Sequence, residues 1–566
     1  MATKRKKVDV VIIGMGAAGG IAALPLARAG LDIVALEAGG RHTPRDFVPD
    51  EVRNDLRSWL GRSKALLEVP TVRTDASEDA RPPQGKVVMA NGVGGSSNHW
   101  TGQSWRLVPW NFRERSNTIR RYGAGAIPQA MNVADWPVSY NELEPFYDTA
   151  ERVMGVSGKA GNLNGRKIKG GNVFEGRRHR EYPMPPLRRT DWTQRMDTAA
   201  KSLHWNPFPG PAGITSTDYR GRPSCDYHGF CTYNGCHVSA KASTAVTTIP
   251  QAEGHKNFKL LTNARVTRIL VDRAGRANGV QYVRGGQTYV QPADVVVLGT
   301  YTYENNRLLM LSKSAAHPNG IGNDKGQLGK HYMSHSYLSV YGLFPGHNLN
   351  RWSGTGAQSA SLDNFDADNF DHSGLGFIGG ATLSAFMEEK PIALSRNTPP
   401  SVPKWGSAWK AWVKSNLNAV GSAFAQIPCQ PYDHNYLDLD PVAKDPSGMP
   451  VIRITFKLGD NETRIAEHLV PRLTEWLKAA GASETWGGDL VPLAVNSHAY
   501  GGTRMGDDPA TSVVDKWLEV HDTPNLFVLG ASCFPSTTSK NPTQTVYATS
   551  WRTADHIVRN WRRLAG

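Results

Sequence analysis

A strand–glycine–helix–strand unit at the N-terminus constrains the fold of this chain more than any other feature. The apolar run Val8 to Ile13 predicts a buried parallel strand. It leads into Gly14-Met15-Gly16-Ala17-Ala18-Gly19, then an Ala- and Leu-rich helix to about Ala29, and a strand from Leu31 to Leu36. Glycines permit a tight turn, and the helix N-terminus attracts a pyrophosphate. The unit predicts a dinucleotide site, and Glu37, placed to accept from ribose hydroxyls, argues against a 2′-phosphate.

A second glycine cluster follows a predicted strand from Lys86 to Met89. It runs from Gly92 to Gly102 and includes Gly94-Gly95-Ser96 and Asn98-His99. Two glycine clusters in one nucleotide-binding unit indicate that the backbone approaches a ligand closely at two places. One place fits the pyrophosphate, and the other fits the ring end of a flavin.

A histidine and an asparagine near the C-terminus are candidates for acid–base work. His498 lies among small residues before Gly501-Gly502, and Asn541 follows 43 positions later in Ser539-Lys540-Asn541-Pro542-Thr543. Facing one substrate hydroxyl, such a pair can take its proton and hold its oxygen. By itself the pair is weak evidence, because a lone histidine is usually a structural or surface residue. Asn541 also begins a predicted helix and could serve as its N-cap.

Charge and hydropathy exclude some classes of partner. The formal net charge is +14, but the basic residues are dispersed, and no basic helix with interleaved aromatic residues indicates nucleic-acid binding. They concentrate locally at residues 4–7 and 166–189; a solvated face is the favoured interpretation of the second group, and docking of an acidic subunit is the alternative. No apolar run reaches the roughly 20 residues that span a bilayer. We expect no export signal on this chain, hence a cytoplasmic location, or a periplasmic one by co-export with a signal-bearing small subunit.

Three of the five cysteines form a cluster, Cys225, Cys231 and Cys236. This is not a disulfide framework, and the cluster is a cofactor candidate with His228 as a further ligand. A zinc site, a disulfide or three reduced thiols are the alternatives.

The rest of the chain mixes helices and strands. Residues 258–299 predict a β-meander that returns to the nucleotide unit, and residues 345–420 predict loops over a substrate cavity. The 16 Trp and 18 Tyr suit an aromatic-lined sugar cavity or ordinary packing. Helices are predicted at 137–156, 191–203, 303–312, 460–480 and 541–558, and strands at 436–440, 451–457 and 525–529.

Taken together, these motifs resemble those of the glucose-methanol-choline (GMC) oxidoreductases over the whole length. The N-terminal fingerprint, the Gly92 cluster, the strand ending at Gly299, and His498 with Asn541-Pro-Thr-Gln-Thr occur in the order of that family. Asn98-His99-Trp100, the Trp136-Pro-Val-Ser-Tyr stretch and Tyr182-Pro-Met-Pro-Pro-Leu resemble the large subunits of bacterial gluconate, fructose, glucose and glucoside dehydrogenases.

The resemblance implies FAD and an α/β fold of two interleaved domains. A Rossmann-like FAD-binding domain would comprise residues 1–135, 237–310 and 490–566. A substrate-binding domain, an antiparallel sheet with helices, would comprise 136–236 and 311–489. The implied cofactor-binding residues are Gly14, Gly16, Ala17, Ala18, Gly19, Glu37, Ala38, Gly94, Gly95, Ser96, Asn98, His99, Val266, Gly299, Gly530, Ala531 and Thr543.

The implied activity is an FAD-dependent dehydrogenase that oxidises a secondary hydroxyl of a sugar, glycoside or sugar acid to a ketone. Flavin N5 would accept hydride, His498 would act as base, and Asn541 would hold the hydroxyl oxygen. C3 of a glycoside and C2 of gluconate are the leading positions. Electrons would pass to a cytochrome or quinone, with a small subunit and cytochrome c as partners.

Two further cofactor features come from the resemblance. His99 resembles a histidine that some family members bond covalently to the flavin 8α-methyl group; a non-covalent contact is the alternative, and Trp100 would pack near the ring. Cys225-x5-Cys231-x4-Cys236 departs by one residue from the Cys-x5-Cys-x3-Cys spacing that we associate with a [3Fe-4S] cluster. His335 is expected to be structural.

Other functions remain open at this point. An oxidase would pass the electrons to O₂, as pyranose oxidases do. A lyase would keep FAD without net redox chemistry, and an assembly subunit would bind flavin without catalysis, although the presence of both His498 and Asn541 argues against the last.

Overall fold

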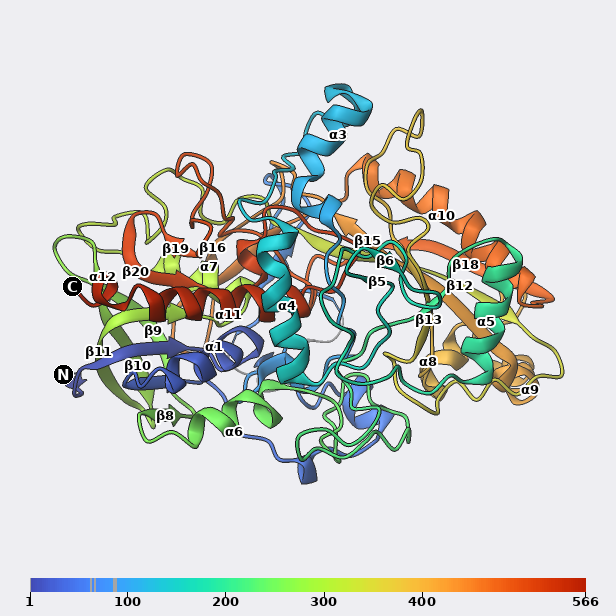
Figure 1. Cartoon of the computed structure of the whole chain (residues 1–566), viewed down its shortest axis with the longest axis horizontal. Coiled ribbons are helices and arrows are strands. Elements are labelled where there is room, and N and C mark those ends of the chain that lie inside the picture. The colour runs from blue at the N-terminus through green and yellow to red at the C-terminus, as the bar shows by residue number, and fades with distance from the viewer. Residues whose placement is uncertain (1, 62–63, 66–67, 85–88) are drawn as a thin grey trace.

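The computed structural model describes residues 2–61, 64–65, 68–84 and 89–566, and its largest sheet contains the N-terminal unit (Figure 1). Strands β20, β11, β2, β3 and β8 run parallel in that order, and β2 and β3 are joined through α1 (Ala17–Arg28) as a β-α-β unit. The nine strands are β1 (Thr3–Lys4), β2 (Val8–Ile13), β3 (Ile33–Leu36), β8 (Phe258–Leu261), β9 (Arg265–Val271), β10 (Ala277–Arg284), β11 (Gln287–Leu298), β19 (Glu519–Val520) and β20 (Thr523–Val528).

A second sheet is antiparallel and has the order β18-β12-β15-β14-β13-β7. Its strands are β7 (Phe208–Pro209), β12 (Ser334–Leu343), β13 (Ser359–Leu362), β14 (Thr382–Phe386), β15 (Val420–Cys429) and β18 (Glu484–Val491). A third sheet joins β4 (Thr71–Arg73) to β17 (Pro450–Thr455) and β16 (Tyr436–Lys444), and a short hairpin pairs β5 (Asn162–Leu163) with β6 (Arg166–Lys167).

Helices flank both large sheets. In Figure 1, α1 and α11 lie beside the parallel sheet on the left, while α5 and α10 lie beside the antiparallel sheet on the right. The helices are α1 (Ala17–Arg28), α3 (Glu114–Tyr122), α4 (Tyr140–Met154), α5 (Asp191–Ser202), α6 (Thr248–Glu253), α7 (Thr302–Leu311), α8 (Pro391–Arg396), α9 (Gly406–Asn416), α10 (Asp460–Ala479), α11 (Thr543–Arg559) and α12 (Trp561–Ala565). No helix among the described residues is long and apolar enough to cross a membrane.

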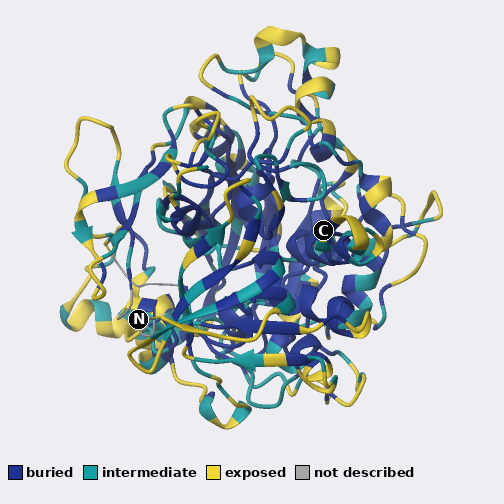
Figure 2. Ribbon diagram, turned by 90° about the vertical axis from the view of Figure 1, so that its left-hand side faces the viewer, coloured by how far each residue is buried: buried dark blue, intermediate teal, exposed yellow. Residues whose placement is uncertain are grey.

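Buried strands and helices form two main apolar cores, one under each large sheet. Figure 2 shows buried residues through the middle of the molecule and exposed residues mainly in its outer loops. The strands of the parallel sheet come from residues assigned to the FAD-binding domain, and those of the antiparallel sheet come almost entirely from the other ranges. The third sheet crosses this division, because β4 pairs with β17. The exact domain boundaries stay a prediction.

Several sequence predictions are confirmed and others are wrong. Val8–Ile13 is a strand, and α4 lies within the helix predicted at 137–156, where Ser139 caps it by accepting from the backbone N–H of Glu142. Residues 345–420 are not simply loops, since they contain β13, β14, α8 and α9. The strands β13 and β14 lie inside the second sheet, and at four and five residues they are too short for their alternation to mark a strand in the sequence. Three of the four residues of the strand predicted at 86–89 lie outside the described part.

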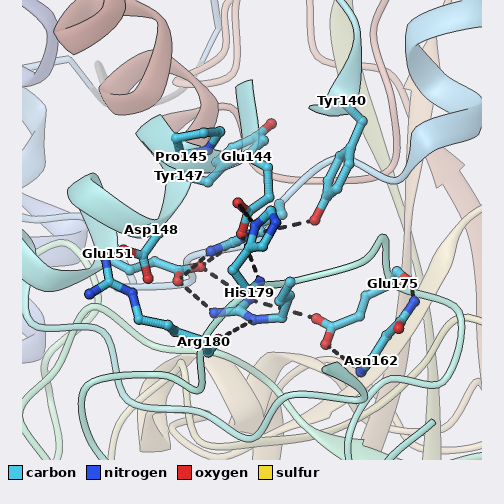
Figure 3. Close-up of polar contacts among 12 residues, drawn as sticks. Tyr140, Glu144, Pro145, Tyr147, Asp148, Glu151, Asn162, Glu175, His179 and Arg180 are labelled. Atoms are coloured by element: carbon cyan, nitrogen blue, oxygen red, sulfur yellow. Dashed lines mark hydrogen bonds and ion pairs between the residues drawn. The ribbon is translucent and has the colours of Figure 1, made fainter. Parts of the chain in front are cut away.

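A buried ion-pair network joins α4 to the segment that follows it (Figure 3). The Glu151 carboxylate accepts two hydrogen bonds from Arg106, at 2.7 and 2.8 Å, and two from Arg178, at 3.2 and 2.6 Å. Arg178 is fully buried, so a solvated face is the wrong interpretation for this member of the basic group at 166–189. Farther along, His179 contacts Glu144 of the same helix.

Candidate active site

A cavity of about 440 Å³ runs from the N-terminal glycine unit to the pair His498 and Asn541. One wall is formed by the carboxyl ends of the parallel strands, where open α/β sheets bind their ligands. The other is formed by alternate residues of β12 and β15 in the antiparallel sheet. The site therefore lies between the two sheets.

The nucleotide end of the cavity has the close backbone packing that a dinucleotide needs. A Cβ atom on Gly95 would lie 2.9 Å from the Cα of Gly16, and one on Gly14 would lie 2.8 Å from the Cα of Thr300. Gly16 caps α1 without a side-chain hydrogen bond, which leaves the N–H groups of the first turn available to a pyrophosphate. These features fit FAD.

Glu37 ties the two glycine clusters together. Its carboxylate accepts from the backbone N–H groups of Met15 at 2.9 Å, Gly39 at 2.8 Å and Gly92 at 3.0 Å. Burial raises its pKa, although these N–H groups act in the opposite direction. Glu37 also lines the cavity, where its carboxylate can accept from a ribose hydroxyl.

The predicted cofactor residues fall into three groups. Eleven line the cavity: Gly16, Ala17, Ala18, Glu37, Gly95, Ser96, His99, Gly299, Gly530, Ala531 and Thr543. Gly14, Ala38 and Val266, together with Glu37, line an adjoining pocket of about 80 Å³. Gly19, Gly94 and Asn98 lie outside both linings; the Asn98 amide donates to the carbonyl of Val93 at 2.8 Å and shapes the glycine loop.

His498 and Asn541 meet at the other end of the cavity. Nδ2 of Asn541 lies 3.2 Å from Nε2 of His498, although 43 positions separate them in the chain. Both side chains line the cavity. Asn541 does not cap α11, because Pro542 occupies the N-cap position and no side-chain cap bond forms.

His335 determines which nitrogen of His498 carries the proton. Nε2 of His335 lies 2.6 Å from the carbonyl oxygen of Thr538, and a carbonyl only accepts, so this nitrogen is the donor. In neutral His335, Nδ1 is then an acceptor, and it lies 2.9 Å from Nδ1 of His498. His498 therefore donates through Nδ1 and keeps an unprotonated Nε2 toward Asn541 and the cavity. The expectation that His335 is merely structural misses this role.

Both histidines are neutral at ordinary pH. Burial lowers the pKa of His498 to about 4. Burial lowers the pKa of His335 well below its usual value, and the neighbouring His498 acts in the same direction. The unprotonated Nε2 of His498 is thus ready to accept a proton.

Gln426 orients the other member of the pair. Its Nε2 donates to the carbonyl of Ser539 at 2.7 Å and lies 3.4 Å from Oδ1 of Asn541. With Oδ1 of Asn541 facing this donor, its Nδ2 faces His498. Sequence reasoning missed both Gln426 of β15 and Tyr337 of β12, whose hydroxyl lies 3.1 Å from Nδ1 of His498.

The three clustered cysteines lie on an irregular segment beside the cavity. Cys231 is buried, and the neighbouring Thr232 and Tyr233 line the cavity wall. Nε2 of His228 lies 4.0 Å from Sγ of Cys231, while its Nδ1 lies 2.7 Å from Asp226. Thiols are the donor type that iron–sulfur clusters use, but among the described residues these three are not a group whose ligand atoms all lie within 4.8 Å of one another, whereas Asp226, His228 and His237 are.

Comparison with known proteins decides the family. The GMC oxidoreductase models match residues 211–336 and 431–550. The gluconate 2-dehydrogenase flavoprotein of Pantoea cypripedii is 36% identical, over 100% of this chain and 96% of that protein. The chain belongs to the GMC oxidoreductase family.

Two other comparisons agree with this family. The fructose dehydrogenase large subunit of Gluconobacter japonicus is 28% identical, with 100% of both chains covered. The crystal structure of a formate oxidase, 16% identical, superposes with a TM-score of 0.63 over 100% of this chain and 99% of that one, which shows the shared α/β fold. This chain is therefore an FAD-type GMC oxidoreductase that acts on CH–OH groups, with sugar and sugar-acid dehydrogenases among its relatives.

Proposed function

We propose that this enzyme is an FAD-dependent dehydrogenase that oxidises a secondary hydroxyl of a sugar, glycoside or sugar acid to a ketone. C3 of a glycoside and C2 of gluconate are the leading positions. The observation that carries the proposal is the unprotonated Nε2 of His498, held beside the Asn541 amide in a cavity that continues to the nucleotide end.

The chain's own groups divide the work of alcohol oxidation. Nε2 of His498 accepts the hydroxyl proton, and Nδ2 of Asn541 donates to the hydroxyl oxygen and holds its C–H bond in one direction. The flavin, when bound, supplies the hydride acceptor at N5. His498, once protonated, would carry a positive charge in the cavity and would favour an anion held there.

The electrons leave, in this proposal, to a cytochrome or quinone through a partner subunit. Two observations support it: the relatives include a flavoprotein and a large subunit of dehydrogenases, and the cysteine segment adjoins the cavity. A [3Fe-4S] cluster on Cys225, Cys231 and Cys236 would let electrons depart singly. Iron and acid-labile sulfide near zero in purified protein would remove the cluster from the proposal.

Anaerobic mixing with sugars, glycosides and aldonates tests the activity. A substrate should bleach the flavin absorbance, and identifying the product by NMR gives the oxidised carbon. If no alcohol bleaches the flavin, a lyase becomes the better assignment. Dye reduction without peroxide in air supports a dehydrogenase, and stoichiometric peroxide supports the oxidase alternative.

Covalent attachment of FAD through His99 is a separate part of the proposal. His99 is buried and lines the cavity at the end of the second glycine cluster. Acid-precipitated protein should stay yellow, and His99→Ala should release its flavin into the supernatant. Complete release of flavin from the wild-type protein would show that the cofactor is not covalently bound.

A further inference from the structure

The far end of the cavity carries a carboxylate. Glu389 lines the cavity with 27% of its side chain exposed, and its Oε1 accepts from the hydroxyl of Ser422 at 3.3 Å. Among the described residues, Lys64 is the single Lys or Arg that lines the cavity, and it pairs with Glu304 at the nucleotide end. The substrate end therefore presents negative charge without a lining cation.

The described Lys and Arg side chains near Glu389 do not line the cavity. Arg351 is 1% exposed, lies 3.8 Å from Glu389 and donates to the Ser422 hydroxyl at 3.1 Å. Lys390 is bound by Asp55 and the carbonyl of Thr232. Neither cation lines the cavity, so neither meets a ligand there. A substrate carboxylate at this end would meet the Glu389 carboxylate directly, whereas the Arg351 guanidinium that pairs with Glu389 at 3.8 Å does not line the cavity, so the contact is unfavourable.

The strand residues beside Asn541 and beside Glu389 indicate how long a substrate must be to reach both groups. Gln426 of β15 lies beside Asn541, and Ser422 of the same strand lies beside Glu389. Four residues of strand at about 3.3 Å each separate these two positions by roughly 13 Å. That span exceeds one pyranose ring and approaches two linked rings.

Aromatic rings lie between the two ends. Phe424 of β15 and Phe386 of β14 both line the cavity, with ring centroids 4.1 Å apart. Such faces pack against the C–H surfaces of sugar rings and attract cations. A carboxylate next to aromatic rings is a favourable setting for an ammonium group.

We propose that Glu389 binds a protonated amino group on the distal ring of a two-ring glycoside, whose other ring presents its hydroxyl to His498. The assignment rests on the proposed function and narrows its substrate class. Single-ring aldonates fit poorly for two reasons. They do not reach Glu389. When C2 is the oxidised carbon, their carboxylate would lie beside His498, and no described Lys or Arg lines that part of the cavity.

Binding calorimetry with matched ligands tests the proposal independently of turnover. The chitosan dimer and cellobiose have the same linkage and differ in their amino groups. At a pH where the amines are protonated, the wild-type holoenzyme should bind the chitosan dimer about tenfold more tightly than cellobiose or gluconate. A tenfold ratio of dissociation constants is the size expected when one charge-assisted contact forms with the chitosan dimer and not with the other ligands.

Glu389→Gln should reduce this preference to near unity, because it keeps the shape of the side chain and removes its charge. Glu467→Gln, which removes the same charge from an exposed position on α10, should leave the preference intact. Equal affinity for both dimers in the wild-type enzyme, absence of chitosan-dimer binding, or an unchanged preference in Glu389→Gln overturns the proposal. Flavin bleaching distinguishes a failure of this substrate assignment from a failure of the proposed function. If gluconate bleaches the flavin and no glycoside does, the substrate assignment is wrong but the enzyme is still a dehydrogenase.

Discussion

At the scale of single residues, the proposed catalysis depends on one proton position on His498. We expect His498→Ala to retain FAD and to lower the rate of flavin reduction by roughly 10²- to 10⁴-fold, since a general base contributes about that much. Stopped-flow absorbance under anaerobic conditions measures this rate, and the bound-flavin spectrum controls for cofactor loss. Near-normal flavin reduction in the variant would contradict the assignment of His498 as base.

His335 is expected to act through His498 rather than on the substrate. In His335→Leu, Nδ1 of His498 loses its acceptor. Part of the molecules would then carry the proton on Nε2, the nitrogen that faces the cavity, and flavin reduction should slow by about tenfold or more. Glutamine offers a carbonyl to His498 and an amide N–H to Thr538. His335→Gln should therefore recover much of the rate, whereas a purely steric role would leave both variants equally impaired.

The low pKa of His498 also predicts the pH profile. Because the imidazole titrates at about 4, it stays neutral, and thus basic, throughout the range from pH 6 to 8. Titration of His498 should therefore not change the rate of flavin reduction between pH 6 and 8. The rate should fall as the pH drops toward the pKa of His498. A rise in rate centred near pH 6.5 would indicate an unperturbed histidine. Circular dichroism at each pH excludes unfolding as the cause.

At the scale of elements, the network around Glu151 anchors α4 to the segment that carries Arg178. Removing one partner of a buried ion pair costs about 3–5 kcal/mol, because the other charge stays buried and unpaired. Arg178→Met should therefore lower the apparent melting temperature by several degrees. Arg166→Met, at an exposed position of β6, removes the same charge and should have little effect in differential scanning calorimetry.

The same network predicts an acid-sensitive stability. Burial by itself would raise the pKa of Glu151, but Arg106 and Arg178 hold it below its usual value. The depressed pKa contributes stability above the unfolded-state value near 4.5, and this contribution is lost as pH falls through the folded-state pKa. The wild-type melting temperature should fall below pH 4.5 more steeply than that of Glu151→Gln, which lacks this titration. Parallel curves for the two proteins would contradict the coupling.

At the scale of the whole molecule, elements that are far apart in the sequence pack side by side in the nucleotide-binding core. Strand β20 joins the parallel sheet beside β11, and α11 packs on α1, although more than 200 residues separate them in the chain. Residues 1–310 alone thus lack part of the nucleotide-binding core. We expect this fragment to be insoluble or unable to bind FAD. A soluble fragment that binds FAD in a flavin-absorbance titration would show that the N-terminal half folds independently.

Local patterns sufficed for the nucleotide unit, whereas the His–Asn pair could be singled out only together with the family resemblance. Val8–Ile13 and the following glycines could be interpreted from the sequence because a buried strand and a tight turn are encoded by adjacent residues. The start of α4 is encoded locally as well, since Ser139 accepts from the backbone N–H of Glu142 three positions later. The short strands within 345–420 could not be identified, because strands of four and five residues give too weak a pattern and their burial comes from the neighbouring strands.

The sequence by itself determined the parallel nucleotide-binding sheet, the family resemblance and the residues His498 and Asn541. Only the tertiary structure decided the proton position on His498, the orientation of Asn541 by Gln426, and the carboxylate at the far end of the cavity. The physical reason is that hydrogen-bond direction and desolvation depend on groups brought close in space. His335 and Thr538 are 203 positions apart in the chain, yet their hydrogen bond determines which nitrogen of His498 can act as base.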